Sequence, residues 1–238
     1  MEHNVDGQAI RDRLVETRGM IDDAAKASGR SPEDVTLVAI SKLHPAQAVA
    51  EAALAGQRHF GENYIQEALA KQDELAHLDL SWHFTGKLQS NKAKFVPGRF
   101  DLLHTIDKLK LAQALHKKLS AACAPRQDVL IEVNLALESQ KAGVAEQDLP
   151  ELAEELLRMG SMNLTGLMLL PPFDLDPEER RPLFARLREL RDGLEVRLGM
   201  KLPVLSMGMT DDFTQAVREG ASLVRVGTRI FGTRPVRT

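Results

Sequence analysis

A lysine stands where a short apolar segment gives way to a loop. Lys42 follows Ser41 and the segment Val35–Ile40, which is rich in β-branched residues. Partial desolvation and nearby cations lower the pKa of a lysine, and the neutral amine is then a nucleophile toward aldehydes. Lys42 is therefore a candidate for a Schiff base. A solvated lysine at the start of a loop is the alternative that its position alone leaves open.

A glycine and two hydroxyl-bearing residues near the end of the chain could bind a phosphate group. Gly227 would let the backbone approach a ligand closely, Thr228 offers a hydroxyl and a backbone N–H at a helix start, and Ser206 offers a second hydroxyl. Ordinary turn and capping chemistry is the alternative. Combined with the amine of Lys42, such a phosphate site would suit a phosphorylated aldehyde.

A third candidate is the arginine two residues before Gly227. If the side chain of Arg225 points into the protein interior, its charge needs a partner. It could donate a hydrogen bond to the nitrogen of a pyridine ring, and because arginine stays protonated, that nitrogen would remain unprotonated. The ring would then be a poorer electron sink. A salt bridge to an acidic residue on a neighbouring strand is the alternative.

Short apolar runs, separated by helical patterns, provide the elements that would position these residues. Eight runs are expected to be strands: Val35–Ile40, Arg58–Phe60, Ser81–Phe84, Asp101–His104, Asp128–Val133, Leu164–Leu169, Pro203–Leu205 and Leu223–Val226. A helix is expected over the first 30 residues, ending near Gly29. Further helical patterns follow the strands: Pro45–Gly56, Glu62–His77, one from Ser90, Asp107–Ala122, Ala145–Met159, Pro177–Leu198, Asp211–Glu219 and a last turn near Ile230.

Eight strand–helix units in about 205 residues fit a (β/α)8 barrel with an added N-terminal helix. A doubly wound open sheet is the alternative. No linker or composition break divides the chain, so residues 1–238 are expected to form a single domain. Active sites of such barrels lie at the carboxyl ends of the strands. Lys42, Gly227 and Thr228 would share that end with Ser206 and Arg225.

Composition limits the classes of partner. The net charge is −3, which gives no reason to expect nucleic acid, although a lysine-rich stretch near the middle of the chain leaves a binding module as a minor alternative. One cysteine, Cys123, allows no internal disulfide, and no Cys/His cluster has zinc spacing. The start of the chain does not resemble a secretory signal, and no apolar run is long enough to span a membrane. A cytoplasmic protein without a metal is expected.

Seven ordered blocks, spread over nearly the whole chain, resemble the YggS/PROSC-type pyridoxal 5′-phosphate (PLP) binding proteins, also called PLP homeostasis proteins. They read Leu-Val-Ala-Ile-Ser-Lys with Pro45; His-Phe-Gly-Glu-Asn-Tyr with Gln66 and Glu67; Trp-His-Phe-Thr-Gly with Leu-Gln-Ser-Asn-Lys; Val-Asn with Glu138, Lys141 and Gly143; Gly-Leu-Met; Leu-Ser-Met-Gly-Met; and Val-Arg-Val-Gly-Thr-Arg-Ile-Phe-Gly. Departures from the family are small: Leu43 follows the lysine, Thr210 replaces a serine, and Lys87 follows Gly86.

The resemblance implies a barrel like that of alanine racemase, with PLP held as a Schiff base on Lys42. It points to Ser206, Gly227 and Thr228 for the phosphate and to Arg225 near the pyridine nitrogen. Asn63 and His83 are implied as nearby pocket residues.

The resemblance also implies a protein that buffers or delivers PLP and affects amino-acid and keto-acid balance without a robust catalytic activity of its own. Apo PLP-dependent enzymes are then expected partners, and because an independent barrel permits a monomer, a monomer is expected. A PLP-dependent enzyme such as an amino-acid racemase is the alternative. A two-base racemase needs an acid/base on each face of the substrate. Alanine racemase supplies a tyrosine from an extra domain, whereas this chain has a single tyrosine, Tyr64, and no residues left for that domain.

Overall fold

Eight parallel strands close into a barrel in the order in which they occur along the chain. The computed structural model describes residues 5–135 and 142–233, so Glu138 and Lys141 of the quoted motifs lie outside the described residues. The strands are β1 (Thr36–Ile40), β2 (His59–Glu62), β3 (Ser81–Phe84), β4 (Leu102–Ile106), β5 (Gln127–Val133), β6 (Met162–Leu169), β7 (Val204–Ser206) and β8 (Leu223–Val226). Closure by parallel pairing of β1 with β8 leaves no free sheet edge. The expected (β/α)8 barrel is confirmed.

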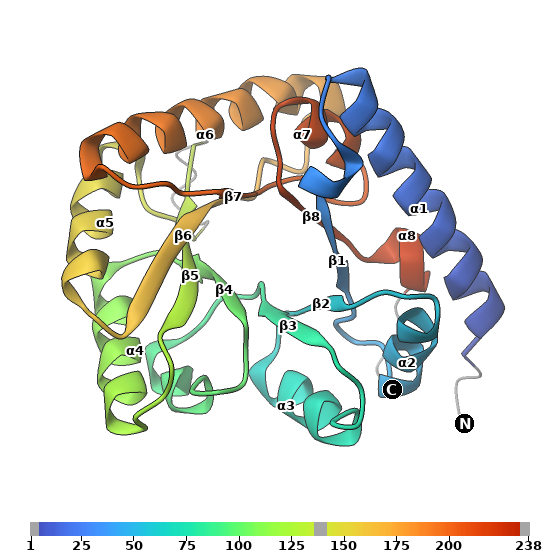
Figure 1. The fold of residues 1–238 in the computed structure, drawn as a ribbon, viewed down its shortest axis with the longest axis horizontal. Coiled ribbons are helices and arrows are strands. Elements are labelled where there is room, and N and C mark those ends of the chain that lie inside the picture. Colours follow the sequence, from blue (N-terminus) through green and yellow to red (C-terminus); the bar gives the residue numbers. More distant parts are fainter. Residues whose placement is uncertain (1–4, 136–141, 234–238) are drawn as a thin grey trace.

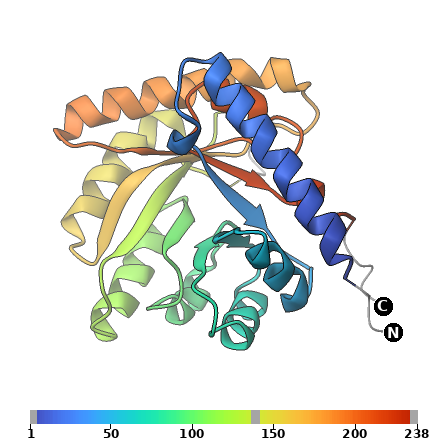
Figure 2. The same ribbon diagram turned by 45° about the vertical axis from the view of Figure 1, so that its right-hand side comes forward.

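Helices surround the barrel (Figure 1). They are α1 (Gly7–Ala27), α2 (Ala46–Leu54), α3 (Ile65–Glu74), α4 (Leu109–Ala121), α5 (Leu149–Arg158), α6 (Pro177–Leu198), α7 (Phe213–Arg218) and the short α8 (Thr228–Phe231). Three 3₁₀ segments add to them: η1 (Pro32–Asp34), η2 (Ser90–Phe95) and η3 (Glu146–Asp148). The helix expected from Ser90 is thus a 3₁₀ turn, η2. Figure 2 shows α1 running along the outside of the barrel, where it contacts α2, α7 and α8.

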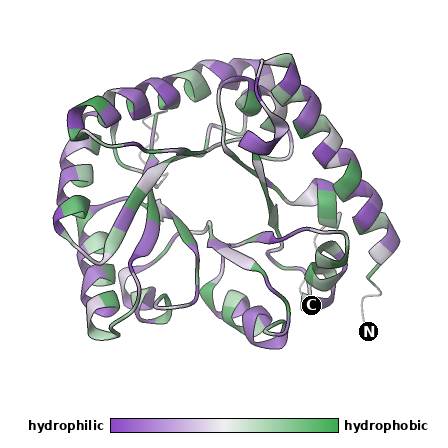
Figure 3. Cartoon of the chain, viewed as in Figure 1, coloured by the Kyte–Doolittle hydropathy of each residue, from purple (hydrophilic) through white to green (hydrophobic). Residues whose placement is uncertain are grey.

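Most of the core lies between the strands and the helices. The outward-facing strand side chains pack against the apolar faces of the helices, while a smaller apolar cluster, with Val38, Leu130 and Met168 among its members, fills part of the barrel interior. Polar and apolar residues alternate around each helix in Figure 3, as expected when one face of a helix packs on a sheet. Among the described residues, no helix is both long and apolar enough to cross a membrane.

Two boundaries differ from the sequence prediction in a way that matters for the site. Strand β7 extends to Ser206, and strand β2 extends to Glu62, so these polar residues are fully buried members of strands instead of loop residues. Apolar content located both strands, but it could not indicate that a polar residue continues each of them. The Ser206 side chain points into the barrel, where it joins a polar layer below the mouth with His104 and Arg225. The Glu62 side chain points outward, to Lys71 of helix α3.

Candidate functional site

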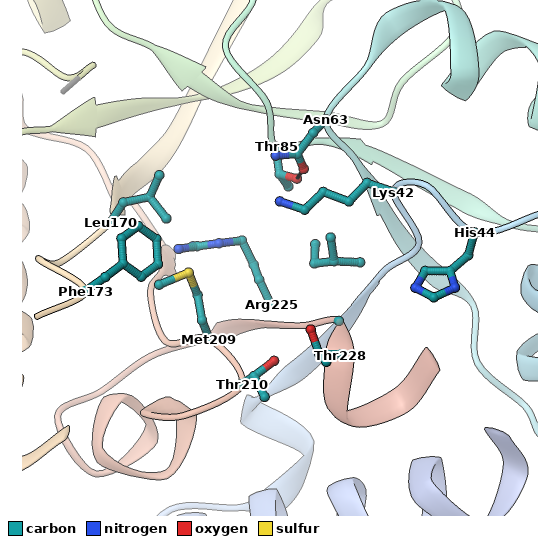
Figure 4. A pocket seen from close by; sticks show the side chains of 12 residues that line it. Lys42, His44, Asn63, Thr85, Leu170, Phe173, Met209, Thr210, Arg225 and Thr228 are labelled. Atoms are coloured by element: carbon teal, nitrogen blue, oxygen red, sulfur yellow. Dashed lines mark hydrogen bonds between the residues drawn. The ribbon is translucent and has the colours of Figure 1, made fainter. Parts of the chain in front are cut away.

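A cavity of about 270 Å³ opens at the carboxyl ends of the strands (Figure 4). Its size is close to the lower end of the range for small-ligand pockets, ~300 Å³. Twelve residues line it: Ile40, Lys42, His44, Asn63, Thr85, Leu170, Phe173, Met209, Thr210, Arg225, Gly227 and Thr228. They come from β8 and from the ends of β1, β2, β3, β6 and β7, which is where a barrel of this kind positions ligands.

Lys42 extends into this cavity from the turn after β1, and Arg225 extends into it from β8 (Figure 4). Arg225 belongs to β8 and is only 4% exposed. Burial lowers the pKa of Arg225 to about 10, which still leaves the guanidinium charged at neutral pH. The cavity therefore combines an amine with a permanent positive charge, a pair that suits an anionic ligand carrying an electrophilic carbon.

Side chains of helix α3 hold the backbone on both sides of Lys42. The amine of Lys71 donates to the carbonyl of Ser41 at 2.7 Å, and the amide of Leu43 donates to Glu67 Oε1 at 2.5 Å. Lys71 also bonds Glu62 at 2.6 Å and Glu67 at 2.8 Å, with its own side chain 6% exposed. Both peptide bonds that flank Lys42 are thus fixed by one buried ion-pair network.

The residue after Lys42 has a backbone conformation that L-residues seldom adopt. Leu43 has φ = 67°, in the left-handed region, where a side chain costs about 1–2 kcal/mol. The hydrogen bond from its amide to Glu67 offsets part of this cost. The turn after Ser41 therefore depends on the α3 network for its shape.

Two threonines supply hydroxyl groups on one side of the cavity (Figure 4). Thr228 begins helix α8, directly after Gly227, and Thr210 follows the Met207–Gly208–Met209 turn after β7. Gly208 has φ = 91°, and a Cβ on it would lie 2.6 Å from the Cβ of Ala216, so this turn requires glycine. Thr210 was noted from sequence only as a hydroxyl replacing a serine, and the structure places it in the cavity wall.

Of the seven residues singled out for the cofactor, five line the cavity and two do not. Lys42, Asn63, Arg225, Gly227 and Thr228 lie together in its wall. Ser206 lies beneath the cavity and is fully buried; its hydroxyl oxygen accepts from Arg225 at 2.5 Å and lies 2.8 Å from His104 Nδ1. His83 is also buried inside the barrel, between two other histidines.

This placement differs from the expectation that Ser206 offers its hydroxyl at the cavity, and its role toward a phosphate stays a prediction. The physical reason is that β7 continues through Ser206, so its side chain points into the barrel at the level of Arg225. His83 belongs to β3, whose observed bounds are the predicted ones, and its ring lies between His59 and His104 below the cavity instead of in its wall.

Other cavity residues were not predicted as ligands. The side chain of Thr85 donates to Asn63 Oδ1 at 3.0 Å, which orients that amide. His44 lies two residues beyond Lys42 and packs against Phe231 with ring centroids 5.3 Å apart. Leu170, Phe173 and Met209 give one side of the cavity an apolar surface (Figure 4). The only feature of the sequence that could have indicated these three residues as part of the cavity is their position, because each follows the carboxyl end of a strand.

Other ionisable groups lie close to the cavity or below it. Glu132, on β5, is buried, and this burial with the nearby Asp107 raises the pKa of its carboxyl to about 7, although Arg225 and Lys87 oppose the shift. Burial also raises the pKa of Glu62, against the effect of Lys71. Among the described residues, no group of three or more His, Cys, Asp or Glu side chains is arranged to hold a metal ion.

Known proteins resemble this chain over nearly its whole length. A family model described as "Alanine racemase, N-terminal domain" matches residues 20–235. The pyridoxal phosphate homeostasis protein of Pseudomonas aeruginosa is 46% identical over 225 residues, covering 94% of this chain and 96% of the relative. The protein of the same name from Aquifex aeolicus is 42% identical over 223 residues, covering 94% of this chain and 97% of the relative.

Solved structures give the same picture. PipY of Synechococcus elongatus, determined with PLP bound, superposes with a TM-score of 0.83 at 40% identity and covers 94% of this chain and 100% of its own. An alanine racemase from Corynebacterium glutamicum has a TM-score of 0.74 at 20% identity, covering 98% of this chain but 63% of its own, and it indicates the barrel fold alone.

Proposed function

Because the chain belongs to the family of the pyridoxal phosphate homeostasis proteins, we propose that it holds PLP on Lys42 and serves intracellular PLP homeostasis by buffering or delivering the cofactor. The observation that carries this proposal is the meeting of Lys42, Arg225 and two threonine hydroxyls in one cavity. PLP supplies an aldehyde that amines capture and a ring that can accept electrons.

The chemistry of the cavity wall fits the parts of PLP. The Lys42 amine is the group that can bond the aldehyde carbon covalently. Thr210 and Thr228, with the backbone at Gly227, are the donors for the phosphate. Leu170, Phe173 and Met209 offer an apolar surface for a ring, and Met sulfur packs favourably on aromatic rings. We assign Asn63 to the rim of the same site, oriented by Thr85.

Arg225 is assigned to the ring nitrogen, and this assignment supports a carrier more than an enzyme. A guanidinium that stays protonated can only donate, so it leaves the ring nitrogen unprotonated and weakens the ring as an electron sink. A racemase would need strong carbanion stabilisation and a second acid/base. Tyr64 is half-exposed and lines a neighbouring cavity with Lys87, not the one that holds Lys42.

The test is an absorption titration of the purified protein with PLP, followed by borohydride reduction and peptide mapping. We expect a visible band and a label on Lys42, both absent in Lys42→Ala. Lys87→Ala is the matched control, because Lys87 lines the adjacent cavity, and it should keep the band. A label on another lysine, or no band in the wild-type protein, would contradict the proposal.

A second measurement separates a carrier from an enzyme. The PLP-loaded protein is incubated with an apo PLP-dependent enzyme in the presence of a scavenger that destroys free PLP. Activation of the recipient despite the scavenger supports delivery. Sustained turnover of amino acids by the pure protein, lost in Lys42→Ala, would favour the racemase-type alternative. Size-exclusion chromatography tests the accompanying proposal that the protein is a monomer.

A further inference from the structure

A continuous chain of hydrogen bonds crosses the barrel interior below the cofactor cavity. His59 Nδ1 lies 3.0 Å from His83 Nε2, and His83 Nδ1 lies 2.9 Å from His104 Nε2. His104 Nδ1 lies 2.8 Å from Ser206 Oγ, which accepts from Arg225 Nη1 at 2.5 Å. The chain joins strands β2, β3, β4, β7 and β8. It begins at His59, which lines a separate cavity at the amino ends of β1 and β2, and ends at the wall of the cavity that holds Lys42.

The direction of every hydrogen bond in this chain follows from its last member. Arginine can only donate, so the Ser206 oxygen accepts from Arg225. Among the described residues the other hydrogen-bond partner of this hydroxyl is His104 Nδ1, so donating its proton there leaves no buried O–H unsatisfied, whereas a proton on His104 Nδ1 would leave the Ser206 proton without an acceptor. His104 then carries its own proton on Nε2 and donates it to His83 Nδ1. By the same reasoning His83 carries its proton on Nε2, donates to His59 Nδ1, and leaves His59 with its proton on Nε2.

The electrostatic surroundings favour the neutral histidines that this pattern requires. His83 and His104 are 4% and 0% exposed. Burial, with a smaller effect of His59, lowers the pKa of His83 to about 3, and burial with His83 and Arg225 lowers the pKa of His104. A neutral imidazole has one donor and one acceptor nitrogen, which is what each link of the chain uses.

Arg225 depends on this chain because its other partner is also uncharged. Its Nη2 donates to the carbonyl of Leu169 at 2.9 Å, and in the part of the chain that the structure describes it forms no ion pair. The sequence left open a salt bridge between Arg225 and an acidic residue on a neighbouring strand. Among the described residues, Arg225 forms no such salt bridge. A buried guanidinium that loses one of two neutral acceptors has an unsatisfied donor and freedom to turn.

We propose that His104 and Ser206 are positioning residues for Arg225, with the three histidines held in the Nε2–H tautomer so that the Ser206 oxygen always faces the guanidinium. The guanidinium is thereby fixed at the wall of the cavity before any ligand enters. The proposal rests on the proposed function for the identity of that ligand, PLP. The part of the proposal that concerns the histidine tautomers and the direction of the hydrogen bonds does not depend on any ligand.

The first test reads the tautomers directly. Long-range ¹H–¹⁵N spectra of the protein labelled at histidine, in the absence of PLP and at pH 7.5, distinguish protonated from unprotonated ring nitrogens. We expect His59, His83 and His104 each to show a proton on Nε2 and an unprotonated Nδ1, with assignments from single His→Asn variants. A proton on Nδ1 of His104, or a charged ring at His83 or His104, would overturn the proposal.

The second test measures PLP affinity in variants that keep Arg225. Ser206→Ala and His104→Leu should bind PLP about tenfold or more weakly, the effect of removing a hydrogen bond to a charged group. His104→Asn should regain most of the affinity, because an Asn side-chain oxygen occupies the place of Nδ1. The control is His116→Leu, which removes a similar His–Ser hydrogen bond, 2.7 Å long, between His116 on helix α4 and Ser161 before β6, and should leave the affinity unchanged.

A double-mutant cycle shows whether Ser206 acts through Arg225. In an Arg225→Met background, Ser206→Ala should change the PLP affinity less than about twofold. An undiminished loss in that background would mean that Ser206 acts by another route, and the proposal would fail. If the wild-type protein does not bind PLP, the proposed function fails instead, and the tautomer measurement alone decides the positioning chain. Circular dichroism of each variant confirms that affinity is compared between folded proteins.

Discussion

At the scale of single residues, the position of Lys42 is fixed by hydrogen bonds to the two peptide groups that flank it, and both bonds come from side chains of helix α3. Ser41 is bonded through its carbonyl to Lys71 and through its hydroxyl to Glu62 at 2.7 Å. Lys71 and Glu67 are one helical turn apart on α3, so a single helix face positions the turn that carries the reactive amine.

Lys71→Met tests this arrangement. The change leaves the buried carboxylate of Glu62 and the partly buried carboxylate of Glu67 without their cation, and breaking a buried pair costs about 3–5 kcal/mol. We expect a loss of that size in the free energy of unfolding from urea titrations, together with weaker PLP binding. Lys201→Met is the control, since the Lys201–Glu195 pair is exposed and such pairs contribute ~1 kcal/mol or less.

The pH dependence of the same variant has a definite sign. Burial raises the pKa of Glu62 above its usual value, so the folded state binds this proton more tightly than the unfolded chain does and stability from this group is lost as pH rises. Removing Lys71 removes the charge that opposes this shift. The destabilisation of Lys71→Met relative to wild type should therefore be larger at pH 8 than at pH 5, and an equal loss at both values would contradict the role given to Glu62.

Residue types alone predicted much of the site. Lys42, Gly227 and Thr228 could be found because each follows an apolar strand at the end where a barrel binds ligands. Ser206 was expected at the cavity because sequence does not show where a short strand stops, and β7 continues through it. His83 was implied by the family resemblance; its strand was bounded correctly, but sequence does not show how deep inside the barrel a strand residue lies. The histidine chain was invisible for a related reason: His59, His83 and His104 are 21 or more residues apart and meet only when the barrel closes.

At the scale of elements, the turn between β7 and α7 decides where Thr210 and Met209 lie. Gly208 takes a positive φ there, and its Cα faces the start of α7 so closely that a methyl group would meet Phe213 Cα at 2.9 Å. The Met209 amide donates to Asp212 Oδ1 at 2.6 Å, and Asp212 in turn pairs with the buried Arg180 at 2.8 Å. The turn is therefore held from both α6 and α7.

Gly208→Ala should displace this turn. A Cβ there meets both backbone strain and packed atoms, so we expect a loss of at least about 2 kcal/mol in unfolding free energy and weaker PLP binding. Gly193→Ala is a matched control with the opposite sign. Gly193 lies within α6 with nothing near a new Cβ, so alanine there should stabilise the protein by about 0.5–1 kcal/mol. Thermal and urea unfolding of the two variants, side by side, give the comparison.

Element boundaries were predicted well where apolar periodicity and capping agree. Helix α6 begins at Pro177 after an Asp176–Glu179 capping box and ends before Gly199, which has a left-handed conformation, and its predicted bounds are the observed ones. By contrast, a helix was expected from Ser90 where the structure has the 3₁₀ segment η2, because its lysines and Ala93 do not distinguish an α-helix from a 3₁₀ turn. Local signals fix helices, whereas the ends of the short strands depend on pairing across the barrel.

At the scale of the whole molecule, the polar layer inside the barrel makes stability sensitive to acid. His59 from β2, His83 from β3 and His104 from β4 face one another, with Asp101 near His59 and with Arg225 near His104. All three have lowered pKa values in the folded state, so the unfolded chain takes up protons that the folded one refuses. Their contribution to stability is present above pH 6.5 and is lost as pH falls below it.

The difference between wild type and His83→Gln isolates this effect. Between pH 7.5 and 5.5 the unfolded chain gains nearly one proton at position 83, while the folded protein, with a pKa of about 3 there, gains none. The wild-type protein should therefore lose about 1.4 kcal/mol more unfolding free energy over this interval than the variant. Glu132, whose raised pKa acts with the opposite sign, is present in both proteins and cancels. Equal losses would mean that His83 is already charged in the folded state.

The closed barrel also predicts how PLP binding should appear in unfolding experiments. Strands from both ends of the chain pair directly, β1 with β8, and α1 contacts α7 and α8, so we propose that residues 1–238 unfold as one domain. A ligand that binds only the folded state raises the unfolding free energy by about 2.7 kcal/mol at 100 times its dissociation constant.

If the cavity belongs to one cooperative unit, the whole transition followed by circular dichroism should move to higher urea in the presence of PLP, with an unchanged slope. Trp82, the one tryptophan, lies on β3 and is not part of the cavity wall. Its fluorescence should report the same unfolding midpoint. Lys42→Ala should show a much smaller shift. Two midpoints, with only one moved by PLP, would divide the chain into independent parts and contradict the single-domain proposal, because ligand stabilisation spreads only as far as cooperativity extends.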